Sequence, residues 1–256
     1  MPAGVEQVRI STLRVLDDVD GLTDDDAHDR SRLPGWSRAE VITHLARNAD
    51  GIRGMVEGAA RNEVVAMYPG GREQRAAGIA AGKDAPAGAL RADLGHASDA
   101  LAQAWLLLPG DGWDRIGNAS QPRTMRELPW VRRREVEIHH VDLDVGYEAS
   151  DWPVGFVHNA FDEIFSSFDL RAAPSRPLVD ADYRVVANDH ASAWRVSLRG
   201  ADVRVESDNG GPVDGEARGW GCDVVAWLYG RDPRAAGIMA TGDLGVLRLP
   251  QWFPFS

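Results

Sequence analysis

The stretch that decides the fold is Trp130–Tyr147, WVRRREVEIHHVDLDVGY, which carries two glutamates and two adjacent histidines within one helical pattern. At 100° per residue, the repeat of an α-helix, Glu135 and His139 lie one turn apart on the same face. Apolar residues flank this face on both sides, so both polar groups fall within the apolar stripe. The pattern therefore predicts a helix that turns a carboxylate and an imidazole toward the interior.

Such a pair costs free energy unless its members are hydrogen-bonded to each other or bound to a metal. One interpretation of Glu135 and His139 is a satisfied buried hydrogen bond, and a third ligand nearby would favour a metal site instead. Glu137 and His140 project elsewhere, with Arg133 and Asp144, on the charged side of the helix, which we expect to face water.

The composition is that of a globular chain, with 256 residues, 44% hydrophobic and 26% charged. This length allows two modest domains or one large one. The net charge of −11 argues against binding to nucleic acid or to anionic membranes, because no basic stripe is available to neutralise phosphates. Cys222 is the single cysteine, which excludes an internal disulfide and a Cys-based zinc site. Without a signal-peptide pattern or a long apolar run, we expect a soluble cytoplasmic protein.

Four blocks of helical periodicity precede residue 150, separated by turn signals. The second opens at Ser37, where Ser37-Arg38-Ala39-Glu40 fits a capping box, and the fourth is entered through Thr124–Glu127 with Pro129 in the first turn. The blocks cover approximately residues 4–19, 37 onward, 86–108 and 124–147. Four amphipathic helices predict a four-helix bundle, whose core can host a metal between facing helices. The Ala- and Gly-rich stretch Arg72–Ala87 is expected to be a mobile connection.

After residue 150 the pattern changes to strands with flanking helices. Helices are expected at about Val154–Leu170 and Cys222–Tyr229, and strands at Tyr183–Ala187, Ala193–Leu198 and Asp202–Glu206. We therefore predict an α+β fold, with a four-helix bundle over residues 1–150 and a smaller α+β domain over 151–256.

The second helix supplies a third candidate ligand, His44, at the border of its apolar stripe. A lone histidine there is commonly a satisfied core residue. Facing Glu135 and His139, it completes two imidazoles and one carboxylate, a catalytic zinc set with the fourth position open, although other divalent metals accept the same donors. Asp142, on the same face, is either an outer partner that orients a ligand histidine or a buried carboxylate bonded to backbone.

Motifs along essentially the whole chain resemble the mycothiol-dependent maleylpyruvate isomerase family. They are LPGWSRAEVITHLARNADG (33–51), MYPGG (67–71) followed by REQRAAGI (72–79), REVEIHHVDL (134–143) and VVAWLYGRDP (224–233). The resemblance implies a DinB-like bundle followed by a domain related to the sterol-carrier fold, and zinc held by His44, Glu135 and His139. It places the family's two functional arginines on Arg75 and Arg231. Arg72 is the alternative for the first arginine, and His140 is the alternative ligand.

The resemblance also implies a reaction, the cis-to-trans conversion of maleylpyruvate to fumarylpyruvate in aromatic catabolism. A thiolate adds to the activated alkene, the resulting single bond rotates, and the thiolate leaves. Mycothiol provides this thiol in the family, and a metal deprotonates a thiol whose ordinary pKa is about 8.5. Arginines would hold the two carboxylates of the substrate and stabilise the enolate. We expect a monomer or a small homo-oligomer.

Two other functions are compatible with the same residues. The chain could be a mycothiol S-transferase that conjugates another electrophile, and its product would then keep the sulfur. It could also be a non-enzymatic ligand-binding protein with a structural, closed zinc site, since a fold does not fix a function.

Overall fold

The structure, a computed structural model, describes residues 4–119, 121–190, 192–232, 234 and 236–255. The chain divides into two compact units, Met1–Tyr147 and Glu148–Ser256, called here the first and the second unit. Helices build the first unit and a sheet with helices builds the second, which confirms the α+β class. Within the described residues, none of the helices combines the length and the apolar character needed to cross a bilayer.

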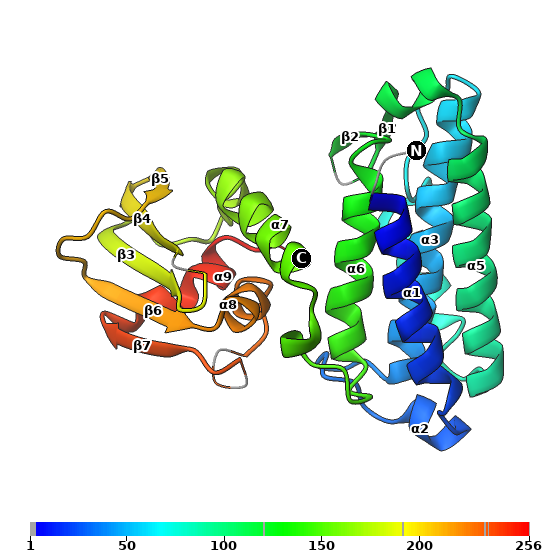
Figure 1. Ribbon diagram of the computed structural model, residues 1–256, viewed down its shortest axis with the longest axis horizontal. Helices are drawn as coiled ribbons and strands as arrows, with labels where there is room; N and C mark the ends of the chain where they lie inside the picture. The colour runs from blue at the N-terminus through cyan, green and yellow to red at the C-terminus, as the bar shows by residue number, and fades with distance from the viewer. Residues whose placement is uncertain (1–3, 120, 191, 233, 235, 256) are drawn as a thin grey trace. The chain divides into compact units, whose positions relative to one another are not determined.

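Four long helices run side by side through the described part of the first unit (Figure 1). They are α1 (Gly4–Asp20), α3 (Arg38–Ala60), α5 (Ala87–Leu107) and α6 (Leu128–Asp142). Shorter elements connect them: α2 (Asp24–His28), α4 (Gly71–Ala80), the 3-10 helix η1 (Gly110–Asp114) and a hairpin of β1 (Ile116–Asn118) and β2 (Pro122–Thr124). Their shared core is apolar, with Ile42, Leu45, Ile52, Leu94 and Leu101 at most 1% exposed.

The capping box predicted at the start of α3 is confirmed. The backbone N–H of Glu40 donates to Ser37 Oγ at 3.2 Å, and the N–H of Ser37 donates to Glu40 Oε2 at 2.8 Å. Each bond satisfies a backbone donor that the first helical turn leaves unpaired, and together they fix the residue at which α3 begins. His44 therefore lies in the second turn of a helix whose start is set by its own sequence.

The capping pattern at Thr124–Glu127 does not begin α6, although the sequence had predicted that it would. The N–H and Oγ1 of Thr124 both donate to Glu127 Oε2, each at 2.8 Å, but the helix begins only at Leu128. The pair therefore closes the turn between β2 and α6. Pro129 lies in the first turn, where its missing N–H leaves no hydrogen bond unmade.

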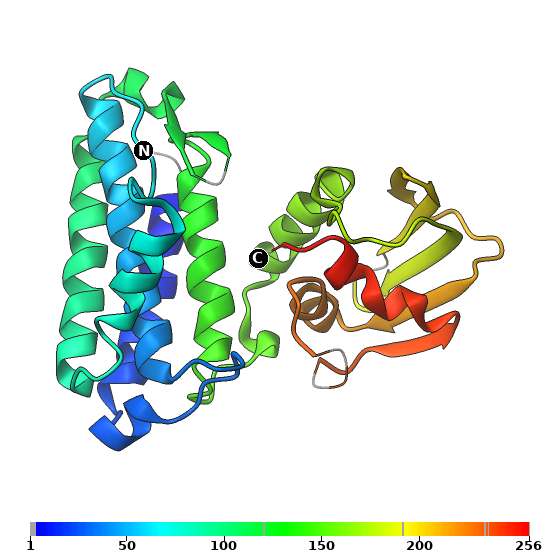
Figure 2. The same ribbon diagram turned by 180° about the vertical axis from the view of Figure 1, so that it is seen from behind.

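The stretch Arg72–Ala87, expected to be a mobile connection, is largely ordered as α4, and the expectation was wrong. This helix packs against α3 on the side of the bundle away from α1 (Figure 2). Its anchor is Ile79, which is 4% exposed. Just beyond it Gly82 approaches Thr43 so closely that a Cβ would collide with that side chain. Ala- and Gly-rich residues carry little periodicity, so only packing on α3 reveals this helix.

The expectation that Arg133, Glu137 and His140 face water is also wrong, because all three are at most 5% exposed. Helix α6 packs on α1 as well as on α3, so a second face is buried. Each of them bonds to a side chain of α1. Arg133 Nη1 donates to Gln7 Oε1 at 2.8 Å, and Ser11 Oγ donates to Glu137 Oε1 at 2.5 Å. His140 Nε2 lies 2.7 Å from Asp18 Oδ2. Hydrogen bonds across the α1–α6 contact thus replace the solvent that the charged pattern had suggested.

The second unit contains a five-stranded sheet over its described residues, in the order β5-β4-β3-β6-β7. Its strands are β3 (Val179–Ala187), β4 (Ser192–Gly200), β5 (Asp202–Ser207), β6 (Gly215–Gly219) and β7 (Met239–Gly242). Only the β3–β6 pairing is parallel. The helical elements are η2 (Ala149–Asp151), α7 (Val154–Ser166), η3 (Asp169–Arg171), α8 (Gly221–Leu228), η4 (Leu244–Arg248) and α9 (Leu249–Trp252).

The three predicted strands are confirmed as β3, β4 and β5, whereas β6 and β7 were not predicted. Strand β6 reads GEARG and β7 reads MATG, so neither shows the alternation of apolar and polar side chains that marks a strand. Gly215 is needed in β6 because a Cβ there would collide with the backbone oxygen of Asp243. Pairing with β3 and β7, rather than local propensity, makes this segment a strand.

Candidate metal centre

Two helices of the first unit bring three potential metal ligands together. His44 comes from α3, and Glu135 and His139 come from α6 one turn apart. One ligand atom from each lies within 4.8 Å of the other two. Within the described residues this is the single cluster of histidine, cysteine and carboxylate side chains with such spacing. The triad that the helical projection predicted is therefore present as a geometric cluster.

The nitrogen atoms of both histidines are directed at the same carboxylate oxygen. His44 Nε2 lies 3.1 Å and His139 Nε2 lies 3.7 Å from Glu135 Oε2. The two imidazole rings meet edge to face, with centroids 4.6 Å apart. The His44 side chain is 2% exposed, whereas the Glu135 and His139 side chains keep 22% and 17% exposure. The cluster is thus closed on the α3 side and accessible on the α6 side.

Asp142 orients one of the histidines. Its Oδ2 lies 2.8 Å from His139 Nδ1, and the residue is 1% exposed. A carboxylate accepts the proton of Nδ1, which leaves the lone pair of Nε2 free and pointed at the cluster. Of the two roles considered for Asp142, the structure favours that of an outer partner for a ligand histidine.

Arg75 contacts the other histidine. Its Nη2 lies 3.3 Å from His44 Nδ1. Arginine can only donate, so in this arrangement Nδ1 accepts and Nε2 carries the proton that is shared with Glu135. Arg75 is half-buried on α4, whereas Arg72 on the first turn of the same helix is exposed. The structure thus brings Arg75, rather than Arg72, to the triad.

The electrostatic environment gives two members of the triad the protonation that a metal needs. Burial lowers the pKa of His44 to about 4, although the hydrogen bond with Glu135 opposes this effect. Burial acts to raise the pKa of Glu135, but the hydrogen bond from His44 and the nearby charge of His139 outweigh it, and the pKa is lowered. At neutral pH the cluster therefore presents a neutral imidazole and a carboxylate, the forms that bind divalent cations.

His140, the alternative ligand, does not join the cluster. Its Nε2 lies 2.7 Å from Asp18 Oδ2, and its ring stacks on Tyr147 with centroids 3.9 Å apart. These contacts hold it on the α1 side of α6. The choice of helical face made from the sequence agrees with this placement.

Two further side chains near the triad, Asn48 and Tyr68, were not singled out from the sequence. Asn48, one turn after His44, has its Nδ2 3.4 Å from Glu135 Oε2 and accepts from Arg132 Nη1 at 2.9 Å. The hydroxyl of Tyr68 is buried and makes no well-formed hydrogen bond with any described residue. Burial raises its pKa, and the nearby Arg75 guanidinium opposes the rise. The i, i+4 spacing of His44 and Asn48 could have revealed one of them, whereas Tyr68 precedes α4 in a turn that carries no periodic signal.

Arg231, the second arginine assigned by resemblance, belongs to the second unit. It follows α8, where its backbone N–H donates to Ala226 O at 3.1 Å and its Nη1 donates to Tyr229 O at 2.6 Å. These bonds close the C-terminal end of the helix and hold the base of the side chain in place. The triad and Arg75 are thus gathered within the first unit, and Arg231 lies in the other.

Comparison with known proteins gives matches in both sequence and structure. Residues 8–144 match the family described as the mycothiol maleylpyruvate isomerase N-terminal domain. The crystal structure of the mycothiol-dependent maleylpyruvate isomerase is 23% identical, with a TM-score of 0.78 over 94% of this chain and 93% of that one. A mutant of that enzyme with one histidine replaced by alanine gives 21% identity and the same TM-score and coverage. These likenesses show a shared fold. None of the curated proteins compared with the chain matches it.

Proposed function

The chain belongs to the mycothiol maleylpyruvate isomerase family, and from this membership we propose that it is a thiol-dependent cis–trans isomerase. Its proposed reaction converts maleylpyruvate to fumarylpyruvate with mycothiol as the thiol. The observation that supports the proposal is the cluster of His44, Glu135 and His139, whose ligand atoms lie within 4.8 Å of one another. Three protein ligands and an accessible side are typical of catalytic metal sites.

The residues present fit a zinc ion. Two imidazole nitrogens and one carboxylate oxygen are donors that zinc accepts, and Asp142 fixes the orientation of His139. Other divalent metals share these donors, so zinc is the metal we propose rather than the one that the donors alone select. When bound, the metal would keep a thiol in its nucleophilic thiolate form at neutral pH.

Arg75 is the residue we propose for binding a substrate carboxylate. If Nε2 of His44 held a metal, the proton of the neutral imidazole would reside on Nδ1, and Arg75 would lose the acceptor that it contacts at 3.3 Å. Its guanidinium would then be available for a carboxylate, which it can bind through two parallel hydrogen bonds. In a half-buried position this charge would also stabilise the enolate that forms when a thiol adds to the alkene.

Tyr68 would supply a second donor on the same side. Burial raises the pKa of its hydroxyl, so the proton stays on the oxygen at neutral pH and can be donated. Among the described residues, the hydroxyl has no well-formed hydrogen-bond partner. We infer that a carboxylate or ketone oxygen of the substrate accepts this proton as a hydrogen bond, because a buried donor is stabilised when an acceptor reaches it.

To test the function, the zinc-loaded protein is mixed with maleylpyruvate, with and without mycothiol. The absorbance of the mixture and the mass of the product are then measured. Conversion to fumarylpyruvate that requires mycothiol, with no change in mass, is the expected result. The metal-free protein, prepared by chelation, is the control and should be inactive. A product that retains the sulfur of mycothiol would instead identify an S-transferase. No reaction in metal-loaded, folded protein would contradict the proposed substrate.

A further inference from the structure

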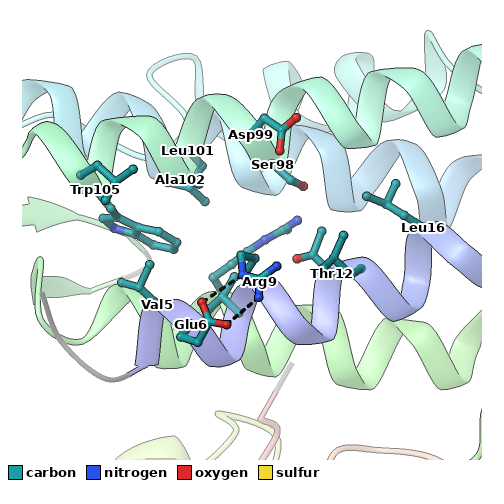
Figure 3. Close-up of a pocket in the computed structure, with 14 residues that line it drawn as sticks. Val5, Glu6, Arg9, Thr12, Leu16, Ser98, Asp99, Leu101, Ala102 and Trp105 are labelled. Atoms are coloured by element: carbon teal, nitrogen blue, oxygen red, sulfur yellow. Dashed lines mark hydrogen bonds and ion pairs between the residues drawn. The ribbon is translucent and has the colours of Figure 1, made fainter.

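A cavity of about 240 Å³ lies between α1 and α5, within the first unit. Figure 3 shows its two walls, with Val5, Thr12 and Leu16 from α1 opposite Leu101 and Trp105 from α5. None of the triad residues lines it. Most of the lining is apolar, and the volume is smaller than that of pockets for drug-sized ligands, which begin at about 300 Å³.

The cavity contains an unpaired buried cation. Arg132, from α6, lines it and is 1% exposed. Its Nη1 donates to Leu45 O at 2.8 Å and to Asn48 Oδ1 at 2.9 Å, both neutral acceptors. Its Nε and Nη2 are buried and have no hydrogen-bond partner, and it forms no ion pair with any described residue. A guanidinium removed from water in this way is destabilised unless an acceptor reaches it.

Three more buried polar atoms line the same cavity without partners among the described residues: Thr12 Oγ1, Ser98 Oγ and Trp105 Nε1. The indole nitrogen can only donate, and each hydroxyl offers one proton. Together with Nε and Nη2 of Arg132 they place several unsatisfied hydrogen-bond donors at this cavity, and the two hydroxyls can also accept. Buried polar atoms in folded proteins are nearly always paired, and an acceptor with negative charge would pair these donors and also compensate the charge of Arg132.

The two free atoms of Arg132 specify the shape of that acceptor. The N–H groups of Nε and Nη2 point in parallel from one edge of the guanidinium plane, which matches the two oxygens of a carboxylate. Arg126 binds the carboxylate of Asp114 through the same two atoms elsewhere in this chain, at 2.6 and 3.2 Å. The remainder of the ligand would lie against Leu16, Leu101 and Ala102, which line the cavity and favour an apolar body.

The rim of the cavity limits the charge of the ligand. Glu6 from α1 and Asp99 from α5 line the cavity and are exposed, and Glu6 pairs with Arg9 at 2.6 Å (Figure 3). Arg9 compensates the charge of Glu6, so Asp99 is the carboxylate that would repel a second negative group at the outer end of the ligand. A single carboxylate on an apolar chain therefore complements the interior and the rim together.

We propose that the α1–α5 cavity is a second ligand site, which binds a monocarboxylate with a medium-length apolar chain through Arg132. The site is separate from the metal centre and does not depend on the proposed isomerase activity. Asn48 connects the two, since it contacts both Arg132 Nη1 and Glu135 Oε2. Ala102→Leu therefore tests the cavity with Asn48 and its bond to Arg132 in place, whereas a substitution at Arg132 removes that bond.

The test titrates the zinc-loaded full chain with sodium octanoate in a calorimeter, with 1-octanol as the neutral probe of the same length. We expect one octanoate per chain, bound at least ten times more tightly than octanol. Ala102→Leu fills the cavity from α5 and should abolish binding of octanoate. Ala92→Leu makes the same change at an exposed position of α5 and should leave binding unchanged. Arg132→Met, which removes the cation, should weaken the binding of octanoate and leave the binding of octanol little changed.

Three results would overturn the proposal. One is the absence of binding at millimolar octanoate in folded, metal-loaded protein, which would mean that water alone satisfies the donors. Another is equal affinity for octanoate and octanol. The third is octanoate binding that persists in Ala102→Leu or that disappears when the metal is removed, since it would then occur elsewhere or at the metal centre. If Arg132→Met does not fold, the Ala102→Leu and octanol comparisons still decide the question.

Discussion

His139 and His140 are neighbours in the chain, yet their side chains form their hydrogen bonds on different faces of α6. His139 Nδ1 contacts Asp142 and its Nε2 points toward Glu135, whereas His140 contacts Asp18 on α1. The 100° step between consecutive residues of a helix is enough to separate a candidate ligand from a structural residue.

We expect His139→Ala to lose the bound metal and His140→Ala to keep it. Removing His139 deletes one of three ligands, whereas removing His140 leaves the triad intact. His140→Ala should instead lower the free energy of unfolding by about 2 kcal/mol, because a buried hydrogen bond and the stack on Tyr147 are lost. Elemental analysis of the purified variants and their thermal unfolding test both statements. Metal retained in His139→Ala and lost in His140→Ala would refute the assignment of helical faces.

Arg75 and Arg72 lie on the same short helix and form a matched pair for substitution. We expect Arg75→Ala to lower kcat/KM for maleylpyruvate by about 10²–10³-fold, the effect of removing one donor that stabilises developing negative charge. Arg72→Ala should change it little, because Arg72 is exposed. Steady-state kinetics of both variants with saturating mycothiol give the comparison. A larger loss in Arg72→Ala would reverse the two roles.

At the scale of elements, a hydrogen-bonded carboxylate joins two strands of the second unit. Asp208 follows β5 and accepts from Arg184 Nε of β3 at 2.8 Å and from Arg195 Nε of β4 at 3.1 Å. Its side chain is 5% exposed. Burial acts to raise the pKa of Asp208, but the hydrogen bonds from Arg184 and from the N–H of Gly210 outweigh it, and the pKa is lowered.

This lowered pKa gives a prediction about acid stability. A carboxylate with a lowered folded-state pKa stabilises the fold above its unfolded pKa of about 3.9, and the stabilisation is lost as pH falls through the folded-state value. We expect Asp208→Asn to reduce the free energy of unfolding by about 2 kcal/mol at neutral pH, with a smaller difference from the unsubstituted protein in acid. Denaturant unfolding at neutral pH and at about pH 3 measures both values. An equal difference at the two pH values would show that the charge of Asp208 is not the cause.

Helix α6 shows how one element can serve several neighbours. Its Glu135 and His139 face α3, its Glu137 and His140 face α1, and Arg132 lines the cavity that α1 shares with α5. This helix therefore carries polar side chains on several of its faces, and most of these side chains are buried. Such a helix has no single apolar stripe, so periodicity identifies the faces only once the neighbours are known.

At the scale of the whole molecule, the residues assigned by the family resemblance are divided between the two units. The three candidate ligands belong to the first unit, and Arg231 belongs to the second. The expected DinB-like and sterol-carrier-like identities of the two units, with the boundary at residue 150, stay predictions, as does the role of Arg231.

We expect Arg231→Ala to keep its metal, since no candidate ligand is changed, and to lose about 10²–10³-fold in kcat/KM. Arg234→Ala is the matched control, because Arg234 is an exposed arginine in the same loop, and it should retain activity. Metal content and steady-state turnover are measured on the same preparations. Full activity in Arg231→Ala would show that the reaction does not need Arg231.

The sequence by itself determined the features that depend on local order. The four long helices, the capping box at Ser37 and the shared face of Glu135 and His139 follow from residue spacing along one helix. The strands β3, β4 and β5 follow from the alternation of their side chains. His44 could be matched to the pair because an inward-facing histidine in a bundle must meet a neighbouring helix.

Only the tertiary structure decided the features that depend on contacts between distant segments. Packing on α3 makes α4 a helix and brings Arg75, rather than Arg72, to His44. Packing of α6 on α1 buries Glu137 and His140, although their pattern resembles that of a solvated face. The cavity that Arg132 lines exists because α1 and α5 do not fill the space between them. Each of these outcomes depends on which surfaces meet, and local spacing carries no information about the partner that a surface will find.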